Sequence, residues 1–166
     1  MFYYRERDYL MMIIRKITLT IALITVATTG NFSVASEADG MIRIKSSHNV
    51  STTLDKLETA LTKKGMTIFK RIPHSTGAKK VGLNIRDTEL LVFGNPKIGT
   101  LLMQCQQTAA LDLPMKALAY EDENHQVWLA YNDPAYLAKR HHVKNCNQVI
   151  NKMTKALANF TKAATQ

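Results

Sequence analysis

Residues 91–100 read LVFGNPKIGT, and this stretch places a strand directly before a helix. The nearly continuous apolar run at 88–93 (TELLVF) is typical of a buried strand. Asn95 is a favourable N-cap residue, and Pro96 takes the first helical position, where its missing N–H costs nothing. Apolar residues then recur at helical spacing as Ile98, Leu101, Leu102 and Cys105. The stretch therefore predicts a strand, a tight turn and a helix.

The same stretch also allows a different interpretation, because Gly94 and Gly99 have the spacing of the glycines in a phosphate-binding loop. Thr100 stands where that loop needs its lysine, however, and Pro96 removes one backbone donor. Lys97 lies beside the predicted helix N-terminus, which leaves anion binding open as a milder alternative. We favour a turn with a capped helix and do not expect nucleotide hydrolysis.

Beyond this stretch, strands and helices alternate without a regular β-α-β repeat. Hydrophobic alternation and β-rich runs predict strands at 41–45, 66–72, 88–93, 115–120 and 127–131. Capping and spacing predict helices that begin near 51, 75, 96, 134 and 145, with Thr52 and Asp55 fitting a capping box in the first. The order β-α-β-(α)-β-α-β-β-α-α predicts an α+β fold, with a mainly antiparallel sheet and helices packed on one face.

The N-terminal segment has the pattern of a secretory signal peptide at 1–36. Arg15 and Lys16 precede the uncharged run ITLTIALITV, and small residues lead to a predicted cleavage after Ser36. The run is well short of the ~20 apolar residues that a membrane-spanning helix needs, so we expect no stable membrane anchor after cleavage. The true start is left open between Met1 and the later Met11 or Met12. We expect a periplasmic or secreted protein with a single domain at 37–166.

The chain carries 22 Lys and Arg against 13 Asp and Glu, a formal net charge of +9. A basic surplus of this size permits nucleic acid, an anionic membrane or an acidic ligand as partners. The lysines are scattered, however, and no basic block or series of stacking aromatics accompanies them. We therefore expect a solvated basic surface and no nucleic-acid partner.

Cysteine and histidine residues near the C-terminal end raise the question of a metal or redox site. Cys105 and Cys146 would allow a disulfide in an oxidising compartment, but Cys105 lies on the core stripe of a predicted helix, where free cysteines bury readily, so the sequence favours unpaired thiols and leaves the pairing open. His142 and Cys146 are four residues apart, with His141 adjacent, and imidazole plus thiolate suits copper or zinc. A predicted helix break between them makes this spacing unreliable.

No set of catalytic residues is evident. The three adjacent carboxylates at 121–123 lie on a predicted turn and point in different directions, so a general acid paired with a general base is not expected. We therefore name no catalytic residue and no cofactor.

Three motifs in order, FGNPKIGTLLMQ (93–104), ALDLPMKALAYED (110–122) and VWLAYNDPAYLAKRHH (127–142), resemble the bacterial domain-of-unknown-function family 302. The resemblance covers about residues 41–144. It implies a curved antiparallel sheet with helices on one side, a homodimer, and no established activity. The family's motif positions in this chain are His74, Gly94, Asn95, Pro96, Thr100, Leu113, Pro114, Tyr131, Pro134 and His141.

Two classes of function follow from these observations. The leading hypothesis is an exported, dimeric module that binds a small molecule or an anion without catalysis. Its polar groups would line one concavity of the sheet: His74, Asn95, Lys97, Tyr131 and His141. The alternative is a metal-handling or redox protein that uses His141, His142 and Cys146.

Overall fold

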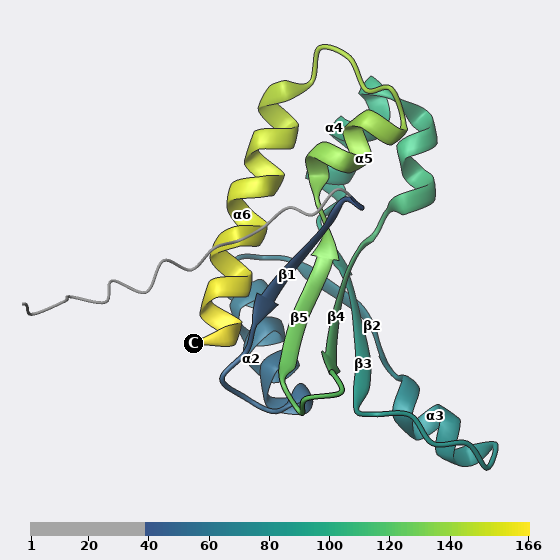
Figure 1. Ribbon diagram of the computed structural model, residues 1–166. Coiled ribbons are helices and arrows are strands. Elements are labelled where there is room, and N and C mark those ends of the chain that lie inside the picture. Colours follow the sequence, from purple (N-terminus) through teal and green to yellow (C-terminus); the bar gives the residue numbers. More distant parts are fainter. Residues whose placement is uncertain (1–38) are drawn as a thin grey trace, which may run out of the picture. The chain divides into compact units, whose positions relative to one another are not determined.

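Five strands form one antiparallel sheet in the order β1-β5-β4-β3-β2 (Figure 1). The computed structural model describes residues 39–166, so the predicted signal peptide at 1–36 lies outside the described residues. The strands are β1 (Met41–Lys45), β2 (Thr67–Pro73), β3 (Thr88–Gly94), β4 (Met115–Glu121) and β5 (Val127–Asn132). The predicted α+β class with a mainly antiparallel sheet is confirmed.

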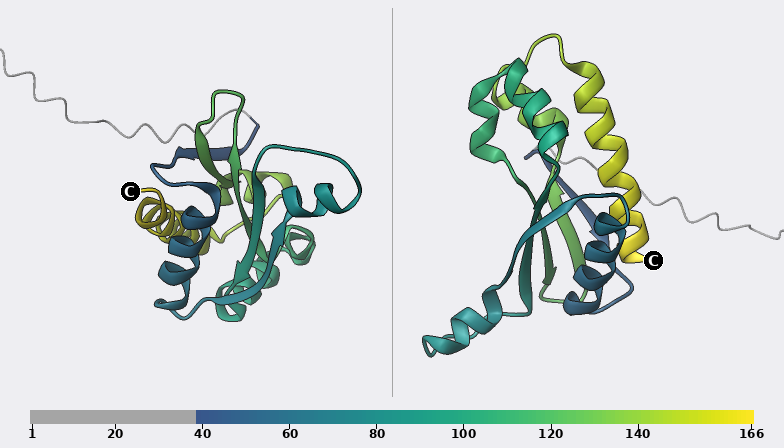
Figure 2. Two further views of the ribbon diagram at one scale, coloured as in Figure 1. Left: turned by 90° about the horizontal axis from the view of Figure 1, so that it is seen from below. Right: turned by 180° about the vertical axis from the view of Figure 1, so that it is seen from behind.

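The helices fall into three places around the sheet. The two longest, α2 (Val50–Thr62) and α6 (Asn147–Thr165), lie side by side on one face (Figures 1 and 2). Three short segments gather at the end where β3 leaves the sheet: α4 (Pro96–Cys105), the 3-10 helix η1 (Gln107–Asp112) and α5 (Pro134–Arg140). The seven-residue α3 (His74–Lys80) stands away from the sheet at its opposite end. The sequence predicted every one of these elements except η1.

The core lies between the sheet and the two long helices. Successive side chains of a strand point to opposite faces, so alternate residues of β3, β4 and β5 face the helices and are buried. The central strand β4 has small residues on this face, Ala117 and Ala119. They lie in the same core as the large side chains of α2. Those α2 side chains, at 0% exposure, are Leu54, Leu57 and Leu61. Truncating one of them to alanine should cost about 2–5 kcal/mol of stability.

The starts of α2, α4 and α5 are built from Asn or Asp caps, whereas α3 and α6 have no side-chain cap. The Asn95 side chain accepts a hydrogen bond from the Lys97 N–H at 2.9 Å, and Asp133 does the same for Ala135 at 2.9 Å. A proline follows each cap at the first helical position, as the sequence predicted. The predicted capping box of α2 is wrong: the cap is Asn49, whose Oδ1 accepts from the backbone N–H of residue 52 at 2.8 Å.

The carboxylate that the sequence assigned to that capping box serves a different contact. Arg71 of β2 donates from Nη1 to Asp55 Oδ1 of α2 at 2.5 Å, and from Nε to Glu89 Oε1 of β3 at 2.8 Å. The hydrogen bond with Glu89 raises the pKa of the Arg71 guanidinium, so its charge is permanent. These contacts fix the edge strand β2 against both α2 and its neighbour in the sheet.

Candidate functional site

A groove of about 720 Å³ lies beside the start of α4 and the middle turns of α6. Most of its lining is apolar and comes from segments far apart in sequence. β3 contributes Phe93, the bulge in β2 contributes Phe69, and α6 contributes Phe160. The other large apolar side chains of the lining are Met66, Ile98, Leu101, Met103, Leu113, Met115, Met153 and Leu157. A groove of this size and lining can take up the apolar part of a small molecule.

Three lysines supply the charge of this groove. Lys64 lies after α2, Lys97 in the first turn of α4 and Lys152 on α6, and all three side chains are exposed. None of their ammonium groups has a hydrogen-bond or ion-pair partner within residues 39–166. The lining contains no Asp or Glu. The groove is therefore electropositive, and an anionic group placed at its edge would meet cations without competing carboxylates.

The backbone N–H groups in the first turn of α4 already have hydrogen-bond acceptors within the protein. The Lys97 N–H is held by the Asn95 side chain, and the N–H groups of Ile98 and Gly99 both donate to the Asn95 carbonyl at 3.0 and 2.9 Å. Pro96 has no N–H to offer. The Asn95 amide also donates to the Gly65 carbonyl at 3.4 Å. Because these amides already have partners, the stretch 94–99 does not form a phosphate cradle. Its free cation is the side chain of Lys97.

His141, the last residue named for the predicted concavity, forms a buried clamp instead. Its Nε2 lies 2.6 Å from Asp112 Oδ2 and its Nδ1 lies 3.2 Å from Thr108 Oγ1. The His141 side chain is 7% exposed and that of Asp112 12%. Arg140 adds a longer contact of 3.3 Å to the other oxygen of the same carboxylate. The clamp joins the end of α5 to η1, and both ring nitrogens of His141 are occupied.

A disulfide between Cys105 and Cys146 lies close to this clamp in the chain and joins the end of α4 to the start of α6. The sequence had left open whether these cysteines pair. Because the Cys146 sulfur is bonded to Cys105, no thiolate is available for the predicted combination of His141, His142 and Cys146. Within residues 39–166, no three His, Cys, Asp or Glu side chains are grouped so that they could hold a metal ion.

The two remaining predicted residues lie away from the groove. His74 is the first residue of α3 and is exposed, at the end of β2 opposite to α4. Tyr131 of β5 is 4% exposed. Burial raises the pKa of its hydroxyl, a hydrogen bond with Thr161 of α6 lowers it in part, and the charge of Asp133 raises it further.

Of the five residues that the sequence placed in one concavity, the groove therefore brings together Asn95 and Lys97. Ligand binding by any of the five stays a prediction. Sequence reasoning missed Lys64 and Lys152, which join Lys97 only through the fold. The only available signal was the position of Lys152 on the polar side of α6.

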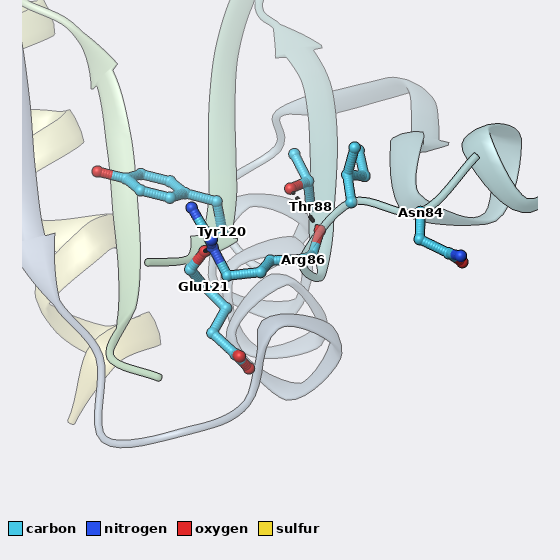
Figure 3. A pocket seen from close by; sticks show the side chains of 6 residues that line it. Asn84, Arg86, Thr88, Tyr120 and Glu121 are labelled. Atoms are coloured by element: carbon cyan, nitrogen blue, oxygen red, sulfur yellow. Dashed lines mark hydrogen bonds between the residues drawn. The ribbon is translucent and has the colours of Figure 1, made fainter. Parts of the chain in front are cut away.

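A second concavity of about 600 Å³ lies beside the β4–β5 hairpin, and Figure 3 shows its lining residues. Arg86 Nε donates to the Glu121 backbone carbonyl at 3.1 Å, and Thr88 Oγ1 donates to the Arg86 carbonyl at 2.9 Å. The Glu121 carboxylate lies 2.7 Å from His125 Nδ1, while Asp122 accepts from the Trp128 indole at 2.7 Å. The hydrogen bond from Arg86 holds the loop before β3 against the hairpin.

Comparison with known proteins gives a family but no activity. Residues 42–160 match the family model described as "Domain of unknown function DUF302". A crystal structure of an uncharacterized conserved DUF302 protein from Bacillus stearothermophilus superposes with a TM-score of 0.70 at 17% identity, covering 76% of this chain and 99% of that one. That likeness shows the same fold.

Sequence relatives carry a different name. Proteins named "Fluoride-specific ion channel FluC 1" from Brucella suis and Brucella abortus are each 47% identical to this chain over 102 residues, which is 61% of this chain. The match spans only 40% and 38% of their lengths. Within residues 39–166, no helix is long and apolar enough to cross a membrane.

Proposed function

We propose that this chain, which belongs to the DUF302 family, is a binding module that takes a small amphipathic anion into the groove between α4 and α6. One observation carries the proposal: the groove combines an apolar lining with three unpaired ammonium groups and no carboxylate. A ligand with a short hydrocarbon body and a single anionic group satisfies both properties. The body would leave water, and the anionic group would lie near Lys64, Lys97 or Lys152.

The size of the groove supports an organic ligand over a bare ion. Pockets that hold small organic molecules have volumes of roughly 300–1,000 Å³, and this groove lies within that range. A small halide ion would use the lysines but would leave the aromatic and aliphatic lining without a role. The relatives named as fluoride channels are compatible with an anion as ligand, although this chain matches less than half of each.

Binding without chemistry is part of the proposal. The groove lining contains no His, Cys, Asp, Glu or Tyr, so the three exposed lysines are its only side chains of the types that act as general acid or base. The pair of His141 and Asp112 lies outside the groove lining and is occupied by structural contacts.

Calorimetry with three small probes tests the proposal. Decanoate has a hydrocarbon body and a charge, decanol has only the body, and acetate or fluoride has only the charge. We expect decanoate to bind more tightly than each of the others, and we expect Lys97→Gln to weaken decanoate but not decanol. Saturable acetate or fluoride binding that equals decanoate binding, or no saturable decanoate binding, would overturn the proposal.

We also propose that the protein is exported and acts as a homodimer in the periplasm or outside the cell. The signal pattern that ends at Ser36 supports export, and so does the Cys105–Cys146 disulfide, since disulfides persist in oxidising compartments. Mass spectrometry of the protein from the periplasm should give an N-terminus near Glu37. An uncleaved cytosolic protein would contradict export.

The homodimer follows from the family resemblance. A row of partly exposed apolar side chains in register across three strands supports it: Ile72, Leu90 and Leu118. Light scattering at micromolar concentration should give a dimer, and Leu118→Arg should give a monomer if this row is the shared surface. A monomeric wild-type protein at that concentration would contradict the homodimer.

A further inference from the structure

Three exposed aliphatic side chains lie close together in the segment 79–86 (KKVGLNIR), which we call the tip segment. Val81 is 72% exposed, Leu83 63% and Ile85 50%. They are three of the seven large hydrophobic residues that are exposed within residues 39–166, and they fall within five positions of the chain. A cluster of this kind marks a surface that contacts something, whereas single exposed apolar residues need no explanation.

The fold places the tip segment at the outer end of the β2–β3 pair. Thr67 pairs with Gly94 at the end next to α4, and Pro73 pairs with Glu89 at the other end, from which α3 and the tip segment extend. Figures 1 and 2 show α3 standing away from the sheet in each view. No residue of α3 is buried. The tip segment is therefore free to approach a flat surface.

Hydrogen bonds give the tip segment a defined shape. Gly82 adopts a positive φ of 77°, and the Leu83 N–H returns to the Ala78 carbonyl at 3.0 Å. At the other end, the contact of Arg86 with the backbone of Glu121 fixes the segment to the hairpin (Figure 3). The three aliphatic side chains are thus presented by an ordered loop, and little further ordering would be needed on binding.

The charged residues of the tip segment indicate which kind of surface it can bind. Lys79 and Lys80 precede the aliphatic residues and Arg86 follows them, while 79–86 contains no carboxylate. A second copy of this chain would bring these like charges together at a tip-to-tip contact. An anionic lipid bilayer complements both features, because aliphatic side chains enter the boundary of the acyl region and cations meet the headgroups.

We propose that the tip segment docks on the surface of an anionic lipid bilayer, with Val81, Leu83 and Ile85 inserted and Lys79, Lys80 and Arg86 at the headgroups. The association is peripheral and reversible. It therefore differs from a stable membrane anchor, which we do not expect after cleavage of the signal peptide. β2 runs for six steps of about 3.3 Å, so the α4 end of this strand lies roughly 20 Å from its tip end. The inference does not depend on what the groove binds.

An environment-sensitive dye at the tip tests insertion directly. Both native cysteines are in the disulfide, so a Cys introduced by Asn84→Cys can be labelled with a nitrobenzoxadiazole dye. Vesicles of phosphatidylglycerol should shift its emission to the blue, and vesicles of phosphatidylcholine should do so much less. The same dye at Asn159→Cys, an exposed position on α6, is the control and should not respond. No shift at residue 84, or an equal shift at both positions, would overturn the proposal.

Vesicle sedimentation with charge and apolar variants separates the two contributions. The triple variant Val81→Ser, Leu83→Ser, Ile85→Ser should weaken binding to phosphatidylglycerol vesicles by about tenfold or more, because the inserted aliphatic area is lost. The double variant Lys79→Gln, Lys80→Gln should weaken it by roughly tenfold or more and reduce its salt dependence. Both sets change exposed residues, so thermal unfolding should remain close to that of the wild type.

Binding equal to the wild type in the triple variant would overturn the proposal. So would a tip dye that is already blue-shifted without vesicles and loses that shift on dilution, because this would indicate contact between copies.

Discussion

The Asn95 side-chain oxygen lies 2.9 Å from the Lys97 backbone nitrogen, and these two residues, separated by Pro96, have different roles at one helix start. The asparagine caps α4 with its side-chain oxygen and braces the turn after α2 through its side-chain amide, which donates to the Gly65 carbonyl. The lysine gives its backbone to the cap and keeps its ammonium group exposed at the edge of an apolar groove. The first residue therefore serves folding, and the second is available for a ligand.

Replacement of the two residues should separate these roles. Asn95→Ala should lower the free energy of unfolding by roughly 0.5–2 kcal/mol, as the loss of an N-cap does. Lys97→Ala is the matched control, and it should leave ligand-free stability nearly unchanged, because a cation in the first turn faces the positive end of the helix dipole. Urea denaturation measures both. A loss in Lys97→Ala as large as that in Asn95→Ala would contradict this assignment.

The clamp between His141 and Asp112 should behave as a buried, coupled pair. His141→Ala should cost roughly 1–3 kcal/mol, because the Asp112 oxygen 2.6 Å away loses its partner in a mostly buried site. A double-mutant cycle with Asp112→Ala should give a clear coupling energy, whereas Arg140→Ala should cost at most about 1 kcal/mol, since that side chain is 47% exposed. Additive losses for the first two residues would show that they do not act as a pair.

Reduction of the disulfide should destabilise the protein. Cys105 and Cys146 are 41 positions apart, and a cross-link closing a loop of that length typically contributes about 2–4 kcal/mol. The unfolding temperature of the oxidised protein should therefore exceed that of the reduced protein and that of the variant Cys105→Ser, Cys146→Ser. A thiol assay on the native protein should find no free thiol. Two reactive thiols in freshly isolated protein would contradict the pairing.

Tyr131 should contribute a fall in stability at alkaline pH. Burial raises the pKa of its hydroxyl in the folded state above the value of about 10 for an unfolded tyrosine. The unfolded chain therefore loses the proton first, and the stabilisation is complete below about pH 10 and is lost as the pH rises through the folded pKa. Ultraviolet titration should show one tyrosine ionising later than the others. Tyr131→Phe should reduce the alkaline loss of stability, and an unchanged profile would contradict the assignment.

Local features of this fold could be predicted from the sequence because they depend on neighbours in the chain. The strand at TELLVF and the caps at Asn95 and Asp133 with their following prolines needed only a few consecutive residues. The cap of α2 was missed because Asn49 lies before the hydroxyl-rich run that attracted the prediction. Asp55, the other half of that predicted cap, is held by Arg71 from a strand sixteen residues later.

The candidate site could not be assembled from the sequence, because it depends on the register of distant segments. Antiparallel pairing of β2 and β3 takes His74 to one end of the sheet and Asn95 to the other, although the sequence placed both in one concavity. The same pairing, together with the packing of α6 near α4, brings Lys64 and Lys152 to the groove beside Lys97. No motif marks these two lysines as members of a site.

A groove-filling substitution on α6 tests the central claim most directly. Ala156 lines the groove, whereas Ala158, two positions along the same helix, is exposed. Ala156→Phe should occupy the space of the ligand body, and Ala158→Phe makes the identical change on the solvent side. With decanoate as the calorimetric probe, binding should weaken by more than about tenfold in Ala156→Phe, since lost apolar burial lowers affinity, and should persist in Ala158→Phe. Equal decanoate binding by the two variants would contradict a ligand site in the groove between α4 and α6.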